Sequence, residues 1–366
     1  MKKIIFAILV IFIMGCAAKT APPTTTNYTP EVTAQVTTTV TIESTTTTTE
    51  EKEQLPPMTR GEADPDFVLE VYNIDKAMDG TTLFADNHNQ EKPRIIEVNM
   101  LGEIIWEYDL PQELKQYTNP GFDVELLPNN NILFELPRNG VYEINRNKTI
   151  VWSYKTSKIS HDADRLPNGN TLIAFGSGDR MSDAQVKEID PKGNIVWQWY
   201  AKTYFDTEAY RSINEEGWSH TNAVLRMDNG DTLVSPRNFN MLVEVNPKGE
   251  VVKTIGQGLM VQQHDPVFLA NGNLLFANHV TPNRIVEIDP NETVVWEYVI
   301  EDLRLSPARD ADRLTNGNTL ITGTTKIFEV TPDKEIVWAF AIKDISAFTK
   351  DTSPMLGFYK AERILK

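Results

Sequence analysis

Apolar and polar residues alternate along short stretches of this chain from about residue 67 to the C-terminus. The stretches end at turn residues, as at Pro167-Asn168-Gly169-Asn170 and Asp190-Pro191-Lys192-Gly193. A period of two bounded by such turns predicts β-strands, and no window shows the spacing of a long amphipathic helix. Asn-Gly adopts the positive φ angles of a tight hairpin at little steric cost. The pattern therefore predicts an all-β protein built from hairpins.

Six Glu residues, each followed by Ile or Val, recur at long regular intervals, and the position nine residues after the Glu is Trp in five of the six repeats. The pairs are Glu97–Trp106, Glu143–Trp152, Glu188–Trp197, Glu244–Lys253, Glu287–Trp296 and Glu329–Trp338. A period of 42 to 56 residues with constant internal spacing indicates a repeat architecture. Each repeat has four short strands, so we expect a six-bladed β-propeller, which leaves few exposed edges. A residue present in nearly every unit usually serves the unit, so we expect the tryptophans to pack between blades.

The end of the chain repeats the start of the sixth unit. Tyr359-Lys360-Ala361-Glu362-Arg363-Ile364 echoes Arg309-Asp310-Ala311-Asp312-Arg313-Leu314. We therefore expect this last segment to supply a strand to blade one and to close the ring.

The first residues have the features of an export signal. Lys2 and Lys3 form a basic start, and residues 4–14 form an apolar stretch that is too short for a dedicated membrane span. The sequence Ile13-Met14-Gly15-Cys16 resembles the lipobox of a prokaryotic lipoprotein. An incidental cysteine at the end of a simple signal is the alternative. Cys16 is the only cysteine, so its lipidation would leave no thiol for a disulfide, a metal or nucleophilic catalysis.

Residues 20 to about 57 are rich in Thr and Pro and cannot bury a core. We expect a lipoprotein signal peptide over residues 1–16, a disordered linker over residues 17–60 and the propeller over residues 61–366. The protein would then lie in the cell envelope outside the cytoplasm, attached to a membrane by its lipid alone.

The charge balance narrows the choice of partners. The chain has 35 Lys and Arg against 51 Asp and Glu, a formal net charge of -16. Because phosphate binding needs a basic surface, we expect no nucleic-acid partner. A negatively charged substrate would be repelled at long range and would have to be held by local cations.

Candidate chemistry appears where the repeats differ. The position eight residues before the Gly of the Asn-Gly turn, or its equivalent, is Tyr72, Phe122, His161, Asn222, His264 and Arg309 in successive repeats. The first strands of a propeller line its axis, so these residues should face one funnel. His220 lies two residues before Asn222, hence on the same strand face, and Arg237 follows on the next strand. The clustering of His, Arg and Asn favours a functional site.

Other residues of the repeat receive structural interpretations. His88 and His279 end second strands, and we expect them in loops or at the rim. Asp123, Asp162, Asp265 and Asp310 follow the funnel position in four repeats, and we expect them to accept structural hydrogen bonds.

We expect no metal at the histidines. Imidazole suits Zn, Cu and Fe, but the neighbouring Arg repels a divalent cation and no carboxylate is placed among the three histidines in the manner of a ligand triad. Arg beside His and Asn instead describes an oxyanion site, which holds a tetrahedral anion through charge-assisted hydrogen bonds.

At these residues the chain resembles the arylsulfate sulfotransferase (arylsulfotransferase) family of exported six-bladed propellers. The matching segments are His161-Asp162-Ala163-Asp164-Arg165-Leu166-Pro167-Asn168-Gly169-Asn170, His220-Thr221-Asn222 with Ser235-Pro236-Arg237, and Gln263-His264-Asp265. The resemblance implies transfer of a sulfuryl group from an aryl sulfate to a phenol, without the nucleotide donor PAPS and with no cofactor. A covalent step on imidazole fits ordinary nucleophilic catalysis.

The resemblance also implies roles for individual residues. His264 matches the nucleophile that becomes transiently sulfated, and His161 matches a further active-site histidine that would serve as the acid–base group at the phenol oxygen. The residues that match sulfuryl-oxygen ligands are His220, Asn222 and Arg237, and Arg309 is added here as a substrate-binding residue from its funnel position. The absence of a P-loop or GxGxxG motif agrees with a donor other than a nucleotide.

Larger family members carry an N-terminal assembly domain and a disulfide near the site, and this chain shows neither pattern, so we expect a monomer. Candidates for contact with the phenol are Tyr72, Phe122, Tyr204, Phe205, Trp218 and Tyr359. A non-catalytic surface propeller that binds a glycan, peptide or small anion is the first alternative. The second, a quinone-cofactor dehydrogenase, is suggested by Gly193 to Trp197 but would require eight blades.

Overall fold

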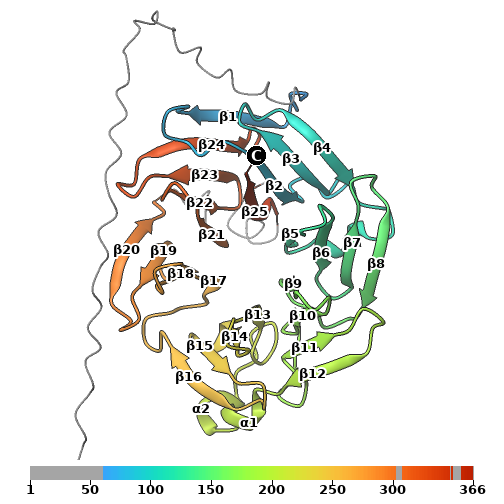
Figure 1. Cartoon of the computed structure of the whole chain (residues 1–366), viewed down its shortest axis with the longest axis vertical. Coiled ribbons are helices and arrows are strands. Elements are labelled where there is room, and N and C mark those ends of the chain that lie inside the picture. The colour runs from blue at the N-terminus through green and yellow to red at the C-terminus, as the bar shows by residue number, and fades with distance from the viewer. Residues whose placement is uncertain (1–60, 302–306, 347, 349–355, 366) are drawn as a thin grey trace, which may run out of the picture. The chain divides into compact units, whose positions relative to one another are not determined.

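The computed structural model describes residues 61–301, 307–346, 348 and 356–365. The expected signal peptide, lipobox cysteine and linker lie outside these residues. Within them, six antiparallel sheets surround one axis as the blades of a propeller, and the only helices described are short turns (Figure 1). No helix in the described part of the chain is long and apolar enough to cross a membrane.

The strands of each blade are given from the axis outward. Blade one contains β25 (Phe358–Ile364), β2 (Thr81–Asp86), β3 (Arg94–Asn99) and β4 (Ile104–Asp109). Blade two contains β5 (Val124–Leu126), β6 (Ile132–Leu136), β7 (Gly140–Ile144) and β8 (Ile150–Lys155). Blade three contains β9 (Ala163–Arg165), β10 (Thr171–Ala174), β11 (Val186–Ile189) and β12 (Ile195–Trp199).

Blade four contains β13 (Thr221–Arg226), β14 (Thr232–Pro236), β15 (Leu242–Val245) and β16 (Val251–Ile255). Blade five contains β17 (His264–Phe268), β18 (Leu274–Asn278), β19 (Arg284–Ile288) and β20 (Val294–Val299). Blade six contains β21 (Asp310–Arg313), β22 (Thr319–Thr322), β23 (Lys326–Val330), β24 (Ile336–Ile342) and, outermost, β1 (Phe67–Tyr72). The short helical turns are η1 (Lys115–Tyr117), α1 (Lys202–Phe205), α2 (Glu208–Arg211) and η2 (Arg237–Phe239).

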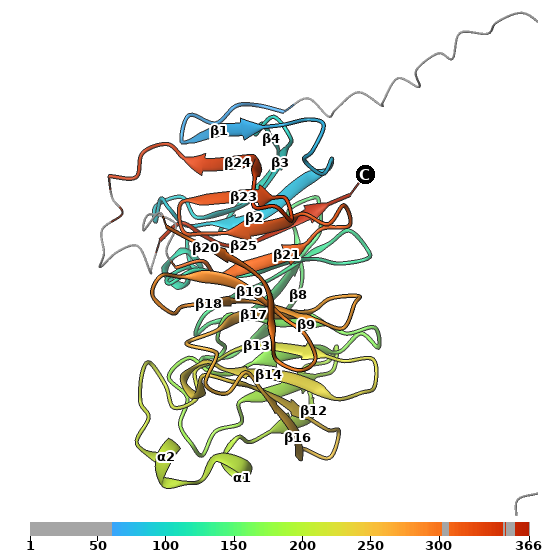
Figure 2. The ribbon, with the colours of Figure 1, turned by 90° about the vertical axis from the view of Figure 1, so that its left-hand side faces the viewer.

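The two ends of the described chain close the ring. β25 pairs with β2, as the sequence echo predicted, and β1 pairs with β24 at the outer edge of blade six (Figure 2). The interpretation of Tyr72 as an axial residue is therefore wrong, because Tyr72 pairs with Trp338 on that outer edge. Since β25 occupies the innermost place in blade one, the strand that opens the first repeat has to add to the neighbouring blade instead.

A pair of residues that recurs in the repeats connects neighbouring blades. Each Glu of the repeat lies opposite its Trp or Lys partner on the next strand, as Glu143 does opposite Trp152. The Trp Nε1 donates to a backbone carbonyl of the following blade, at Arg146, Pro191, Pro247, Pro332 and Met100 for Trp106, Trp152, Trp197, Trp296 and Trp338. The expectation that these tryptophans pack between blades is confirmed.

An Arg on the innermost strand of the following blade completes four of these junctions. Arg165 pairs with Glu143 at 2.9 Å and its guanidinium lies 4.5 Å from the ring centre of Trp152. The junction between blades four and five differs, because Lys253 replaces the Trp and Phe268 stands where other blades have the Arg. Each of six apolar clusters lies between two adjacent blades, so the core is divided among the junctions.

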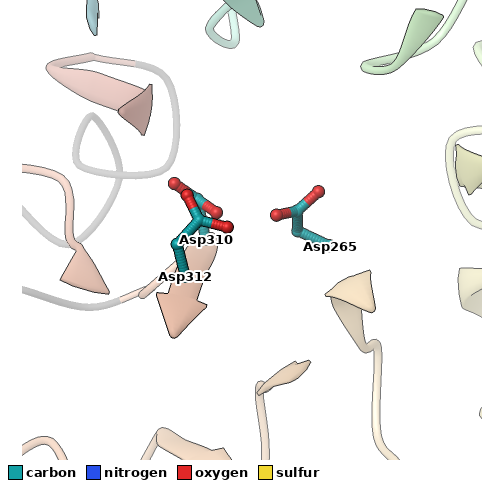
Figure 3. Close-up of side chains that lie close together, drawn as sticks. All are labelled: Asp265, Asp310 and Asp312. Carbon is teal, nitrogen blue, oxygen red and sulfur yellow. The ribbon is translucent and has the colours of Figure 1, made fainter. Parts of the chain in front are cut away.

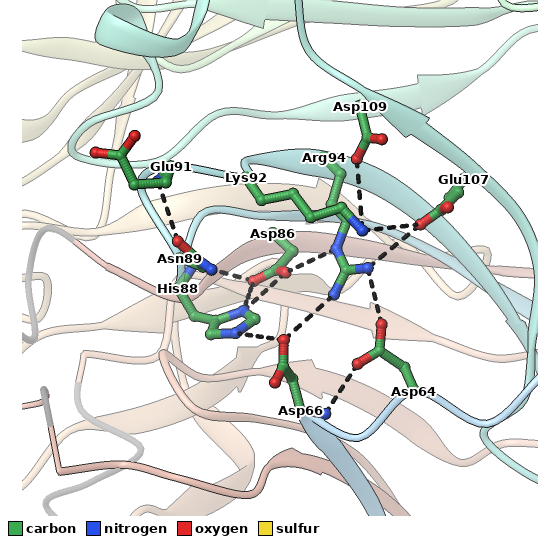
Figure 4. A network of polar contacts seen from close by, with 10 residues as sticks. All are labelled: Asp64, Asp66, Asp86, His88, Asn89, Glu91, Lys92, Arg94, Glu107 and Asp109. Carbon is green, nitrogen blue, oxygen red and sulfur yellow. Dashed lines mark hydrogen bonds and ion pairs between the residues drawn. The ribbon is translucent and has the colours of Figure 1, made fainter.

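A second polar cluster ties the residues before β1 to blade one (Figure 4). Arg94 on β3 is buried and its Nη1 lies 2.8 Å from a carboxylate oxygen of Asp64 and 3.3 Å from one of Glu107. Its Nε lies 3.6 Å from Asp86, whose carboxylate also contacts the ring of His88 at 2.7 Å. The opening segment thus joins blade six through β1 and blade one through Asp64.

Candidate active site

The innermost strands bring the funnel residues of four blades to one narrow cavity at the axis. His161, Asn222, His264 and Arg309 all line it and all are buried. The remaining lining residues are Asp123, Asp265, Asp310, Tyr359 and Lys360. Tyr359 arrives on β25 and takes the axial place that the turn alignment had given to Tyr72.

Irregular backbone places several of these side chains. The pairing of innermost strand with second strand skips a residue at Asn222 in blade four, near Asp265 in blade five and near Tyr359 in blade one. Such β-bulges re-aim side chains next to active sites. His220 and Asp265 also have positive φ angles of 46° and 41°, a strained conformation for residues other than Gly.

His264 is oriented with one ring nitrogen available. Its Nδ1 lies 2.9 Å from the carbonyl oxygen of Gln262, which can only accept, so Nδ1 carries the hydrogen. In the neutral ring, Nε2 then keeps its lone pair.

His279, expected at the rim, stacks on His264 with ring centres 4.2 Å apart. Its Nε2 donates to the carbonyl of Ala308 at 2.7 Å, which fixes the ring against the nucleophile candidate. The sequence did contain a signal. Leu233 in blade four and Leu275 in blade five are equivalent, because each pairs with the repeated Glu of its blade. Arg237 and His279 each follow four residues after these leucines, so they occupy the same position in their repeats.

His161 and His220 form a stack with Tyr359. The ring of His161 lies 4.9 Å from that of Tyr359 on one side and 5.9 Å from that of His220 on the other. The Nδ1 atoms of His161 and His220 are buried and make no hydrogen bond to the described residues, although that of His220 lies 3.9 Å from a carboxylate oxygen of Glu216. Polar atoms left in this state cost free energy unless a ligand or water satisfies them.

Two guanidinium groups and one amide provide hydrogen-bond donors. Arg309 lies 4.8 Å from the ring centre of Tyr359, and its Nη1 donates to the carbonyl of Pro120 at 3.2 Å. Asn222 donates from Nδ2 to the carbonyl of Gln263 at 2.8 Å, which leaves its second N–H hydrogen for a ligand. Arg237, placed just after β14, lowers the proton affinity of His161, His220 and His264, so its charge acts on this site.

Burial keeps the histidines neutral. It is the main cause that lowers the pKa of His220 to about 3 and that of His279 to about 4. The pKa values of His161 and His264 are also lowered well below the ordinary value, again chiefly by burial. Burial lowers the pKa of Arg309 to about 10, which leaves this guanidinium charged at neutral pH. The site thus combines neutral imidazoles with positive guanidinium groups.

Asp179 anchors the backbone that carries His220. Its carboxylate accepts from the backbone N–H groups of Ser219 and His220, each at 3.1 Å. Gly176 allows the approach, because a Cβ there would lie 2.2 Å from the carbonyl oxygen of Thr221. Sequence reasoning missed Asp179, since it lies in a loop of blade three outside the repeat pattern.

The aromatic residues that were expected to contact the phenol lie in different parts of the structure. Tyr359 lines the cavity, whereas Phe122 is buried beside Phe134, with ring centres 6.5 Å apart. Phe205 and Trp218 pack on Phe239. Tyr204 is exposed on α1.

The fold and site define a class: a six-bladed propeller whose axis holds a narrow cavity lined by neutral histidines, an amide and a guanidinium group. The chain belongs to the arylsulfotransferase (ASST) family, whose sequence profile matches residues 56–258. That match includes His161, His220, Asn222 and Arg237 and ends before His264. Membership supports aryl sulfotransferase activity in general and implies small-molecule aryl substrates.

Solved structures resemble this chain at low sequence identity. A protein of unknown function from Bacteroides caccae is 18% identical, with 77% of this chain and 98% of that chain covered and a TM-score of 0.52. A catalytically inactive virginiamycin B lyase from Staphylococcus aureus, solved with quinupristin, is 15% identical, with 76% and 89% covered and a TM-score of 0.48. At these identities the likeness concerns the fold alone. No curated protein gives a significant match to the chain.

Proposed function

We propose that this protein moves a sulfuryl group from an aryl sulfate to a phenol through a sulfohistidine on His264, without PAPS. The observation that carries the proposal is the orientation of His264. Its Nδ1–H is bound to Gln262, its ring is neutral, and it lines the same cavity as Asn222 and Arg309. A neutral imidazole with a free lone pair is a competent nucleophile toward sulfur.

In the first displacement Nε2 of His264 forms a bond to sulfur, and the bond from sulfur to the aryl oxygen breaks with its electron pair on oxygen. A bound sulfate favours the protonated form of His161 by its charge, so His161 can give that oxygen a proton. In the second displacement the acceptor phenol gives its proton to the now neutral His161 and takes the sulfuryl group from His264. Donors from Asn222, Arg237 and Arg309 stabilise the anionic oxygens, each worth about 3 kcal/mol in the transition state.

Intact mass spectrometry tests the covalent step. Mixing the protein with p-nitrophenyl sulfate in the absence of an acceptor should give a sulfuryl adduct, and peptide mapping should place it on His264. His264→Asn should remove both the adduct and the turnover, whereas the matched variant His88→Asn, outside the cavity, should keep them. An adduct on another residue, or full activity in the His264→Asn variant, would refute the nucleophile assignment.

A second function, binding without chemistry, is favoured by one observation. The cavity is narrow and its lining residues are buried, which suits a small anion better than a bound phenol. Binding of sulfate without any turnover of p-nitrophenyl sulfate and phenol would support this alternative.

We also infer that the protein is lipid-anchored through Cys16 outside the cytoplasm. The support is the basic start, the short apolar stretch and the lipobox-like sequence before the cysteine. Cys16→Ser should move the protein from the membrane fraction to the soluble fraction on cell fractionation. An unchanged distribution would contradict the anchor.

A further inference from the structure

The axis of the propeller also carries many acidic side chains, three of which, Asp123, Asp265 and Asp310, line the same cavity as the histidines. Eight carboxyl groups on the innermost strands or directly before them interact with the ammonium group of Lys360 or with one another: Asp123, Glu125, Asp162, Asp164, Asp265, Asp310, Asp312 and Glu362. Lys360 lies 3.4 Å from Asp123 and 3.5 Å from Asp265. One ammonium cannot balance so many carboxylates, and burial raises the pKa of all of them except Asp265, so the cluster must hold protons or a further cation.

The expectation that the funnel aspartates accept structural hydrogen bonds holds for three of them. Asp162 accepts from the N–H of Val224 at 2.6 Å, and Asp310 accepts through Oδ2 from the N–H of Ala361 at 3.1 Å. Asp123 accepts from the N–H of Val124 at 2.6 Å. These bonds account for one oxygen of Asp310 and leave the other to be explained.

The second oxygen of Asp310, Oδ1, has no donor among the described residues, although the side chain is 1% exposed. The carboxyl group of Asp310 interacts with that of Asp265, which offers only acceptor oxygens unless one of the two groups is protonated. Asp310 and Asp312 lie two residues apart on β21, hence on one face of the strand, and Asp265 reaches toward both from β17 (Figure 3). Acceptors that face one another in a buried place require a cation or a shared proton between them.

The geometry points to a calcium ion held by Asp265, Asp310 and Asp312. One oxygen of each residue lies within 4.8 Å of the others. Calcium bonds oxygen at about 2.3–2.6 Å, so one ion can bridge oxygens at this separation, whereas the bonds of Mg²⁺, about 2.1 Å long, reach less far. A shared proton satisfies two carboxylates, but a divalent ion satisfies all three. Water would fill the other coordination positions.

This site differs from the one excluded at sequence level, which concerned the histidines and their neighbouring Arg. Here all the ligands are carboxylates, the type that hard cations prefer. Asp265 and Asp312 remain partly exposed, so the channel offers an ion a way in. The inference does not depend on the proposed sulfuryl transfer, because the ion would be detected by binding and stability.

The test uses the full chain, freed of metal with a chelator and kept at pH 8. Calorimetric titration with CaCl2 should give one site per chain, and CaCl2 at about ten times the dissociation constant should raise Tm by about 3 °C. MgCl2 at the same concentration should give a smaller shift. No heat of binding and no shift in Tm would overturn the proposal, and an equal response to MgCl2 would overturn the choice of calcium.

Asp312→Asn supplies the matched comparison. Asp312 is partly exposed and the substitution removes a charge from a crowded acidic cluster, so the variant should fold and lose the calcium response. Asp164→Asn changes the equivalent position of blade three, because Asp164 and Asp312 pair with equivalent leucines, Leu172 and Leu320. It removes one channel charge without removing a ligand and should keep the response. Equal loss in both variants would show a diffuse charge effect and would overturn the site.

Discussion

His264 and His279 stack at the axis, and their surroundings determine what each ring can do. The carbonyl of Gln262 fixes the tautomer of one, and the carbonyl of Ala308 fixes that of the other. Because burial disfavours the imidazolium form, both rings stay neutral at neutral pH. The guanidinium of Arg237 acts in the same direction on both rings. His264 therefore keeps a lone pair on Nε2 at neutral pH and needs no base to remove a proton from it.

The depressed pKa values predict an unusual pH profile. A catalytic histidine with the ordinary value of 6.5 would be mostly protonated at pH 5.5, and kcat/KM would fall about tenfold between pH 7.5 and pH 5.5. The pKa of His264 lies well below 6.5, so this nucleophile stays neutral over the range, and the pKa of His161, the proposed acid, is lowered too, so its protonated form increases as pH falls. We therefore expect kcat/KM to hold or to rise between pH 7.5 and pH 5.5. Initial rates with p-nitrophenyl sulfate across this range check the prediction, and a tenfold fall would contradict it.

Arg237→Lys should lower kcat/KM by about tenfold or more while the fold is kept, because a point charge replaces a planar two-pronged donor. The measurement is turnover of p-nitrophenyl sulfate together with a circular dichroism spectrum. Arg211→Lys is the control, since Arg211 on α2 is exposed and pairs with Asp206 at 2.6 Å. Unchanged kinetics in the Arg237 variant would remove this residue from the sulfuryl-binding set.

At the scale of elements, irregular segments interrupt a regular repeat where the site lies. The bulges in β13, β17 and β25 occur at the axial position, and loops hold the strands in place. Asp179 in the loop after β10 binds the segment before β13, and Gly176 allows the two backbones to touch. The position of His220 and Asn222 thus depends on a loop from another blade.

Gly176→Ala should displace the start of β13, because the new Cβ would lie 2.2 Å from one backbone atom and 2.3 Å from another of Thr221. We expect a loss of about 1–3 kcal/mol in the free energy of unfolding and a fall in kcat/KM. Gly178→Ala is the matched control. Its Cβ would meet nothing within 4 Å, so only its φ of 62° is unfavourable, and activity should persist at a cost of about 1 kcal/mol. Equal kinetics in the two variants would show that β13 does not need this contact.

At the scale of the molecule, the ring is closed by chain segments from both ends. β25 completes blade one, and Arg363 on it pairs with Glu329 of blade six, both side chains being fully buried. β1 and Asp64 make the second closure through blade six and Arg94. Because Tyr359 and Lys360 sit on β25, the closure also builds part of the axial site.

Arg363→Met should cost about 3–5 kcal/mol in the free energy of unfolding, because it leaves the carboxylate of Glu329 buried without its partner. The double variant Arg363→Met with Glu329→Gln should recover part of that loss, since the unpaired charge is then gone. Denaturant unfolding of the three proteins measures both effects. If the double variant is less stable than Arg363→Met alone, the carboxylate of Glu329 is stabilised by its hydrogen bonds to other residues and does not need Arg363.

Much of this architecture could be predicted because each repeat carries its own local signals. The Glu–Trp spacing and the Asn-Gly turns indicate six similar hairpin pairs, and the echo of residues 309–314 in residues 359–364 predicted the closing strand. The sequence also predicted which residues meet at the axis, because His161, Asn222, His264 and Arg309 share one position in the repeat. Tyr72 was misplaced because a local alignment does not show which blade a terminal strand joins.

The sequence by itself determined the repeat, the strand pattern and the set of residues that depart from it, since these depend on short-range alternation and turn chemistry. Only the tertiary structure decided that His279 stacks on His264, that Asp179 holds His220 and that three aspartates face one another at the axis. Those contacts join residues of different loops and blades through bulges and close backbone approach. Their positions depend on how the closed ring packs, which no single repeat encodes.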